Sequence, residues 1–143
     1  MNHKKRAVTL TTIISALFCC GIIVAASLSP MSDIGPAANQ FGDVGMWIAI
    51  GIMLIPYVIC LVPYMLGVDA MKYVMAVCNV IGLLMALTMV ATVPVIQGVT
   101  TTNIITAGTI GEIVAAIGLM VTNIIWFVVA FRSESKKRAA YQS

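Results

Sequence analysis

Residues 46–94 hold two long apolar runs joined by a short link: MWIAIGIMLIPYVICLVPYML (46–66), GVDA (67–70) and MKYVMAVCNVIGLLMALTMVATVP (71–94). Each run is longer than the roughly 20 residues that an α-helix needs to cross the ~30 Å hydrocarbon core of a bilayer. Two similar runs flank them, at 7–29 and 110–131. Because backbone groups in lipid must pair within their own segment, each run is predicted to be a helix. The sequence therefore predicts an all-α membrane protein, a four-transmembrane-helix bundle that forms a single domain over residues 1–143.

The composition supports the same class of protein. Hydrophobic residues make up 61% of the chain and charged residues 9%, against roughly 45–50% and about 25% in soluble proteins. So little polar material cannot cover a water-soluble fold. The basic residues lie in the two tails and one turn, so no helix shows a basic face for nucleic acid. The partner that the composition implies is the lipid bilayer.

The charges predict the orientation of the four spans. If the spans alternate, one side of the membrane receives every basic residue, and the other side carries only Asp33, Asp43 and Glu112. The basic residues are Lys4, Lys5, Arg6, Lys72, Arg132, Lys136, Lys137 and Arg138. The positive-inside rule then places both termini in the cytoplasm. Trp47 and Trp126 lie near opposite ends of their helices and are predicted to be interfacial aromatic residues.

The first span also has features of a secretory signal peptide. Basic residues precede it, and Val24, Ala25 and Ala26 resemble a small-residue cleavage site. However, the apolar run is longer than the apolar region of a typical signal peptide, and cleavage would leave three spans. We therefore expect the first span to be retained.

The link at 67–70 is predicted to make the second and third spans a tight antiparallel hairpin. Gly67 can take the left-handed conformation that ends a helix, and Asp69 can cap the next helix while complementing its dipole. Pro56 and Pro63 lie on one face of the second span, and each removes a backbone hydrogen bond, so a kink is expected. The kink is either a static bend or a hinge.

One polar side chain from each span lies at a common depth, about 12–13 Å above the cytoplasmic boundary by helical rise. We call Ser15, Tyr57, Asn79 and Asn123 the polar layer. Because isolated amides in hydrocarbon are costly, the two asparagines should face protein and find partners. The layer is either interhelical hydrogen-bonding that fixes register or the lining of a pocket for a solute or cation, reached from the cytoplasm.

Small residues mark faces where helices can pack closely. Gly21 and Ala25 recur in the first span, and Gly111, Ala115 and Gly118 recur in the fourth. These stripes can close the bundle or join two copies of the chain.

Asn79 shares a similar stripe with Gly82 and Ala86. A small-residue face is expected of a tight helix contact. The stripe therefore favours hydrogen-bonding between helices over a pocket as the role of the polar layer.

Glu112 is the only carboxylate within a predicted span. It lies near the outer end of its helix, where it can sit among lipid headgroups and meet the positive end of the helix dipole. The alternative is a membrane-embedded carboxylate that alternately holds a proton or another cation.

The sequence predicts no metal site, no cofactor and no catalytic residue. Its cysteines all lie in predicted spans without a Cys-x-x-Cys pair, and His3 is the only histidine. The cysteines, expected to be buried small hydrophobic residues, are Cys19, Cys20, Cys60 and Cys78.

Several short motifs together are typical of one protein family: SLSP at 27–30, SD at 32–33, GP at 35–36, NQFG at 39–42 and GMW at 45–47. LGVD at 66–69, MKY at 71–73, NIIWF at 123–127 and AFR at 130–132 continue the pattern. Over most of its length the chain resembles a family of uncharacterised small four-span membrane proteins of Bacillus-type bacteria. The resemblance implies a bacterial cell membrane and the same four-helix topology, and it supplies neither an activity nor site residues.

These observations favour a non-enzymatic membrane protein that acts through protein–protein interaction in the bilayer, as an accessory subunit or an immunity protein against a membrane-acting toxin. The alternative is a small dimeric transporter or channel that uses the polar layer. An enzyme is least expected, because acid–base chemistry needs titratable groups that the predicted membrane interior lacks.

Overall fold

The computed structural model describes residues 3–29, 32, 40–99 and 105–141. It contains four helices, α1 (His3–Ser27), α2 (Val44–Met65), α3 (Met71–Val99) and α4 (Ala107–Tyr141). Each holds a segment long and apolar enough to cross a membrane, and these segments are Lys5–Ser27, Val44–Met65, Met71–Thr92 and Ala107–Phe131. The prediction of an all-α protein with four potential spans is confirmed. Asp33 lies outside the described residues.

Two helices are longer than the apolar pattern predicts. Residues 95–109 were expected to link the last two spans, but α3 continues through Pro94 to Val99 and α4 begins at Ala107. A proline removes only one backbone hydrogen bond, and a helix in a bundle can absorb that loss. For the same reason α2 runs unbroken through Pro56 and Pro63. At its other end α4 continues past the apolar segment to Tyr141.

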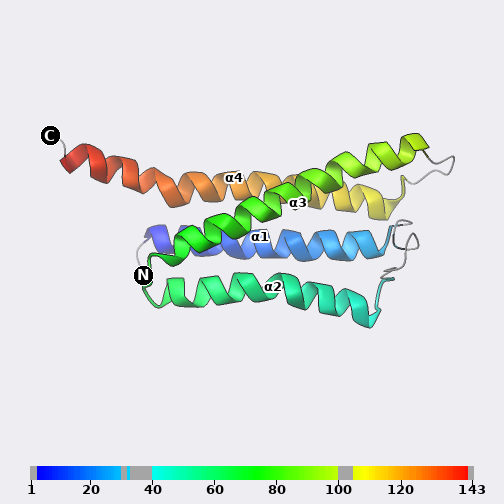
Figure 1. The fold of residues 1–143 in the computed structure, drawn as a ribbon, viewed down its shortest axis with the longest axis horizontal. Coiled ribbons are helices and arrows are strands. Elements are labelled where there is room, and N and C mark those ends of the chain that lie inside the picture. Colours follow the sequence, from blue (N-terminus) through cyan, green and yellow to red (C-terminus); the bar gives the residue numbers. More distant parts are fainter. Residues whose placement is uncertain (1–2, 30–31, 33–39, 100–104, 142–143) are drawn as a thin grey trace.

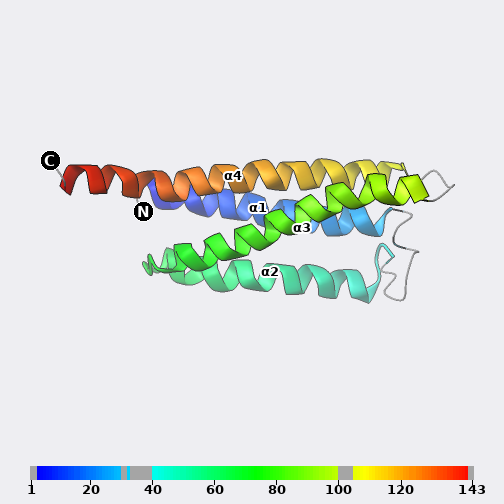
Figure 2. The ribbon, with the colours of Figure 1, turned by 45° about the horizontal axis from the view of Figure 1, so that its top comes forward.

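The helices pack as a ring in which α1 contacts α2, α2 contacts α3, α3 contacts α4 and α4 returns to α1. The longest contact joins α1 to α4, and both chain ends lie at the same end of the bundle (Figure 1). Near the short link α3 lies close to α2, and farther along α3 separates from α2 (Figures 1 and 2). The backbones of α2 and α3 are therefore farthest apart at the end away from the termini.

Small residues form the contact between α1 and α4. A Cβ added to Gly21 would lie 3.9 Å from the Cβ of Ala115, and one added to Gly111 would lie 3.6 Å from the Cβ of Ala25. Gly118 lies directly under the ring of Phe18. The two small-residue stripes thus face each other within one chain, where they let the helix backbones approach closely.

The turn after α2 is built on Gly67. Its φ is 110°, and the amides of Gly67 and Val68 donate to the carbonyls of Tyr64 (3.2 Å) and Pro63 (3.0 Å). This is a Schellman motif, which needs a left-handed residue at that position, so the prediction for Gly67 is confirmed. Asp69, predicted to cap α3, has its carboxylate Oδ1 3.3 Å from Lys5 Nζ. This ion pair ties the turn to the start of α1.

Gly108 provides a test of the contact between α1 and α4. A Cβ at this position would lie 2.6 Å from the carbonyl oxygen of Leu28, so Gly108→Ala must push the helices apart. We expect Gly108→Ala to lower the free energy of unfolding by roughly 1–3 kcal/mol, measured by thermal unfolding in detergent. Gly21→Ala is the matched control, because its new methyl group would make an ordinary contact. Equal stability of the two variants would contradict the packing described here.

Candidate functional site

The polar layer is a hydrogen-bonded network centred on Ser15. The Ser15 hydroxyl donates to Oδ1 of Asn123 at 2.7 Å and lies 3.3 Å from the hydroxyl of Tyr57. The Tyr57 hydroxyl also lies 3.3 Å from Sγ of Cys19, and Nδ2 of Asn123 donates to the backbone carbonyl of Asn79 at 3.3 Å. The layer therefore links α1, α2 and α4 through side chains and reaches α3 through its backbone.

The side chain of Asn79 does not join this network. Its Nδ2 and Oδ1 are both buried and have no hydrogen-bond partner among the described residues. The expectation that both asparagine side chains find partners is therefore wrong for Asn79. Asn123 donates instead to the backbone carbonyl of Asn79. Gly82 packs beside this bond, since a Cβ added there would lie 3.5 Å from Nδ2 of Asn123.

The space on the side of the network that faces Pro56 and Asn79 is closed. A small recess lined by Pro56, Tyr57, Asn79 and their neighbours has a volume of about 0 Å³ and cannot hold a water molecule. The geometry thus matches interhelical hydrogen-bonding more closely than a pocket reached from the cytoplasm. Gly82 contacts the layer, and Ala86 lies one turn away in a buried cluster with Cys19, Tyr57 and Leu119.

Trp126 makes a second polar link that the sequence analysis missed. It was expected at the membrane interface, but it is fully buried, with 0% exposure. Its Nε1 donates to the Thr12 hydroxyl at 2.9 Å, and Thr12 donates to the carbonyl of Val8 at 2.8 Å. The ring also packs edge-on against Phe127 at 5.3 Å between centroids. The indole N–H therefore has a protein partner and needs no headgroup, whereas Trp47 is 64% exposed.

The spacing of residues along the sequence could have predicted the bond between Trp126 and Thr12. Thr12 precedes Ser15 by three residues, and Trp126 follows Asn123 by three. Because α1 and α4 run in opposite directions, both steps lead toward the same end of the bundle. The pair Thr12–Trp126 therefore lies one helical turn from the pair Ser15–Asn123.

The two asparagines should respond differently to replacement by leucine. Asn123→Leu removes two hydrogen bonds and leaves Ser15 without that acceptor, so we expect unfolding to become easier by about 1–3 kcal/mol. Asn79→Leu removes a buried amide that has no described partner, so stability should be unchanged or higher. Thermal unfolding of both variants measures this difference. A larger loss for Asn79→Leu than for Asn123→Leu would contradict the network.

The tryptophans offer an independent test of the buried link. Trp126→Phe keeps an aromatic ring but removes the N–H bond to Thr12, so a loss of about 1 kcal/mol in unfolding free energy is expected. Trp47→Phe changes an exposed ring on α2 and should leave stability nearly unchanged. If the two variants unfold at the same temperature, the bond from Trp126 to Thr12 does not stabilise the bundle.

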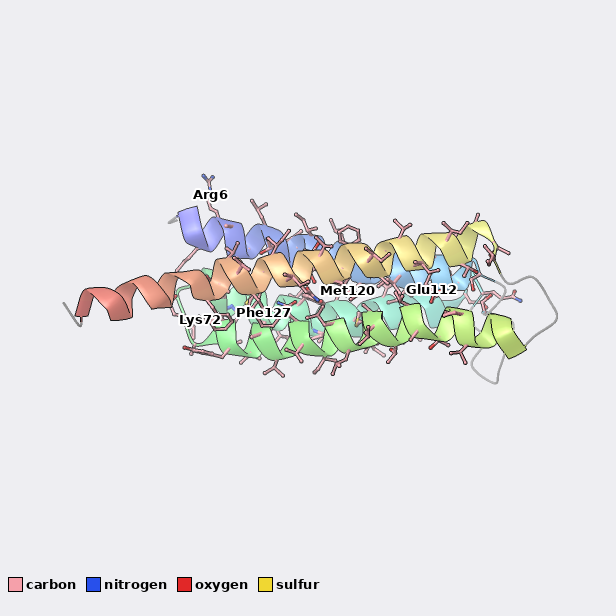
Figure 3. All side chains as sticks on the ribbon, turned by 90° about the horizontal axis from the view of Figure 1, so that it is seen from above. Arg6, Lys72, Glu112, Met120 and Phe127 are labelled. Atoms are coloured by element: carbon pink, nitrogen blue, oxygen red, sulfur yellow. The ribbon has the colours of Figure 1, made fainter. Side chains whose placement is uncertain are left out.

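A larger cavity lies toward the opposite end of the bundle. Its volume is about 310 Å³, and all four helices contribute to its walls. Four methionines line it, which are Met46 and Met53 of α2 and Met85 and Met89 of α3. Cys19 of α1 and Glu112 of α4 also line it. We call this the Glu112 cavity. Figure 3 shows Glu112 far from Arg6 and Lys72, on the other side of Met120 along the bundle.

Glu112 itself is buried, with 3% exposure, and its Oε2 has no hydrogen-bond partner among the described residues. This placement differs from the expected position among lipid headgroups, because Glu112 lies on the face of α4 that packs against the other helices. Glu112 lies in the second turn of α4, which begins at Ala107, and its side chain lines the bundle interior.

Sequence analysis singled out Glu112 but not the cavity beside it. The available signal was the helical spacing of Met46 with Met53 and of Met85 with Met89. Within the described residues, no group of three His, Cys, Asp or Glu side chains is arranged to hold a metal ion. The arrangement fits binding of a small molecule in apolar surroundings.

Comparison with known proteins identifies the family. Residues 1–135 match a family of unknown function, DUF5391. The chain belongs to this family. It is also similar to the uncharacterized protein YxaJ of Bacillus subtilis (strain 168), with 43% identity over 138 residues, which is 94% of each chain. The resemblance drawn from the sequence motifs is confirmed, and no solved structure matches the chain.

Proposed function

We propose that the chain is a non-enzymatic, multi-pass protein of the bacterial cell membrane that acts by binding another protein within the bilayer. An accessory subunit of a membrane complex and an immunity protein against a membrane-acting toxin are the two roles that fit. The observation that carries the proposal is the closed polar layer. Ser15 bonds to both Tyr57 and Asn123, so the bundle interior is held as a fixed scaffold at that depth.

The closed layer also weighs against the alternative function. A transporter or channel that used the layer would need polar groups facing a water-accessible space. The hydroxyls and the Asn123 amide instead face each other, and the adjacent recess has a volume of about 0 Å³. A dimer that conducts solutes through this layer is therefore the less supported candidate.

The surface available to a partner is large. Apolar side chains are exposed on every helix, for example Leu17 on α1, Ile55 on α2, Leu84 on α3 and Ile117 on α4. Beyond Phe131, where the apolar segment ends, α4 continues as a helix to Tyr141 and projects past the other helices (Figure 1). A partner within the bilayer can thus bind a membrane-facing side of the bundle.

The proposal includes the orientation, with both termini cytoplasmic and α2 and α3 as an antiparallel hairpin. Arg6 and Lys72 lie toward the end of the bundle from which α4 projects (Figure 3). Lys5 is paired with Asp69 in the turn after α2, at the same end. Gathering of basic residues at one end supports a cytoplasmic location for that end under the positive-inside rule.

Site-specific photocrosslinking tests the proposed interaction. A photoreactive residue is placed in turn at Leu17, Ile55, Leu84 and Ile117, all exposed, and the cells are irradiated. A discrete heavier adduct from one or two neighbouring faces is the expected result, because a specific partner covers one side. The same variants without irradiation are the control. An unmodified chain at all four positions would overturn the proposal, and an adduct of twice the chain mass would identify a second copy.

Cysteine labelling tests the orientation separately. Val68→Cys places a thiol in the turn after α2, and Gln40→Cys places one before α2. A membrane-impermeant maleimide added to intact spheroplasts should label Gln40→Cys but not Val68→Cys, and inverted vesicles should give the opposite result. The parent chain, whose cysteines all lie in the apolar spans, gives the background. Labelling of Val68→Cys in intact spheroplasts would contradict the orientation.

A further inference from the structure

We propose that the Glu112 cavity binds a small organic ammonium ion, which enters from the bilayer between α2 and α3. The cavity reaches the polar layer at Cys19 and Gly82, but Glu112 makes none of the layer's hydrogen bonds, and the proposed occupant is a small molecule and not a protein. The inference rests on three features, which are a buried carboxylate with one oxygen unpaired among the described residues, mostly apolar walls, and the divergence of α2 from α3.

The first feature is the buried acid. Glu112 is 3% exposed, lines the cavity, and has an Oε2 without a hydrogen-bond partner among the described residues. A buried ionised carboxylate is costly unless it is paired. Arg6 and Lys72 do not supply the partner, because they lie at the far end of the bundle (Figure 3). A cationic ligand in the cavity would provide the missing charge.

The second feature is the size and chemistry of the walls. An apolar cavity of about 150 Å³ is enough to hold benzene, and this cavity has a volume of about 310 Å³. Met46, Met53, Met85 and Met89 line it, and methionine side chains adapt to the shape of what they contact. An apolar group somewhat larger than a benzene ring therefore fits beside the carboxylate.

The same walls argue against an inorganic cation. Calcium and magnesium need about six or more oxygen ligands, or bound water, around them. Methionine sulfur is only a weak acceptor, and no cluster of three metal-binding side chains occurs in the described part of the chain. A substituted ammonium ion needs no such shell, because its carbon substituents can contact the apolar walls directly.

The third feature is the route by which a ligand can enter the cavity. The side between α1 and α4 is closed by the contact of Gly111 with Ala25, and Ser27 donates to the sulfur of Met46 between α1 and α2 at 3.4 Å. Met85 on α3 is 45% exposed, while Leu119 at the back is 1% exposed. α2 and α3 diverge toward this end (Figures 1 and 2), and each lines the cavity with two methionines, so we place the entrance between these two helices.

A pair of isosteric probes tests the proposal. Benzyltrimethylammonium and neopentylbenzene have the same shape and differ in one atom, the charged nitrogen or a neutral carbon. Binding is measured by equilibrium dialysis against the purified full chain in nanodiscs of phosphatidylglycerol, with empty nanodiscs as background. The ammonium should bind more tightly than its neutral isostere by at least about tenfold. Equal binding, or no binding of the ammonium above background, would overturn the proposal.

Two variants assign the binding to the cavity. Glu112→Gln keeps the shape of the side chain and removes its charge, so it should weaken benzyltrimethylammonium at least about tenfold and leave neopentylbenzene unchanged. Ala26→Leu, in the cavity wall, should weaken both probes by filling space. Ala91→Leu, at an exposed position on α3, is the control and should weaken neither. Unchanged ammonium binding in Glu112→Gln or in Ala26→Leu would contradict the site.

Thermal unfolding checks that each variant is folded. Glu112→Gln should be at least as stable as the parent, because Oε2 has no described partner to lose. If Glu112→Gln does not fold, the carboxylate has a structural partner and the proposal fails. A final arm repeats the dialysis with phosphatidylethanolamine in the nanodiscs. Loss of ammonium binding there would show that a lipid headgroup occupies the cavity and would overturn binding of a free solute.

Discussion

Lipid cannot hydrogen-bond, and this constraint shapes the interior of the bundle more than any single contact. In a membrane, each polar side chain within an apolar helix must find a partner inside the protein or remain unsatisfied. Ser15, Tyr57 and Asn123 meet this demand with one another, and Trp126 meets it with Thr12. These bonds join α1 to α2 and α4, and they set the register in which the small residues of α1 and α4 meet.

The two ends of the bundle differ in how their buried polar side chains are hydrogen-bonded. Toward the chain termini, Ser15, Asn123 and Trp126 have hydrogen-bond partners, and only Thr9 and the side chain of Asn79 lack one among the described residues. Toward the other end, α3 separates from α2 (Figures 1 and 2), and Glu112 faces a cavity with one oxygen unpaired among the described residues. A paired interior suits a scaffold, and an unpaired acid in an apolar cavity suits a cationic ligand. The proposed protein partner and the proposed ligand therefore use different parts of one fold.

Membership of DUF5391, together with the similarity to YxaJ, shows the family but carries no activity with it. The functional argument therefore depends on side-chain geometry. Asn79 illustrates this dependence. Its depth along its helix equals that of the other members of the polar layer, yet its side-chain amide lies outside the network, and Asn123 bonds to its backbone carbonyl instead.

Local sequence was sufficient for those features that depend on neighbouring residues along the chain. The four apolar runs predict four helices, because a helix satisfies its own backbone, and Gly67 predicts the end of α2, because the left-handed conformation favours glycine. Helix ends were less predictable, since Pro94 lies inside α3 and not at its end.

Features that depend on contacts between helices required the three-dimensional fold. The burial of Trp126, the isolation of Asn79 and the cavity beside Glu112 all follow from how α3 crosses its neighbours and from which face of each helix turns inward. A single helix does not specify that choice, because its apolar residues surround it on all sides and can face either lipid or protein.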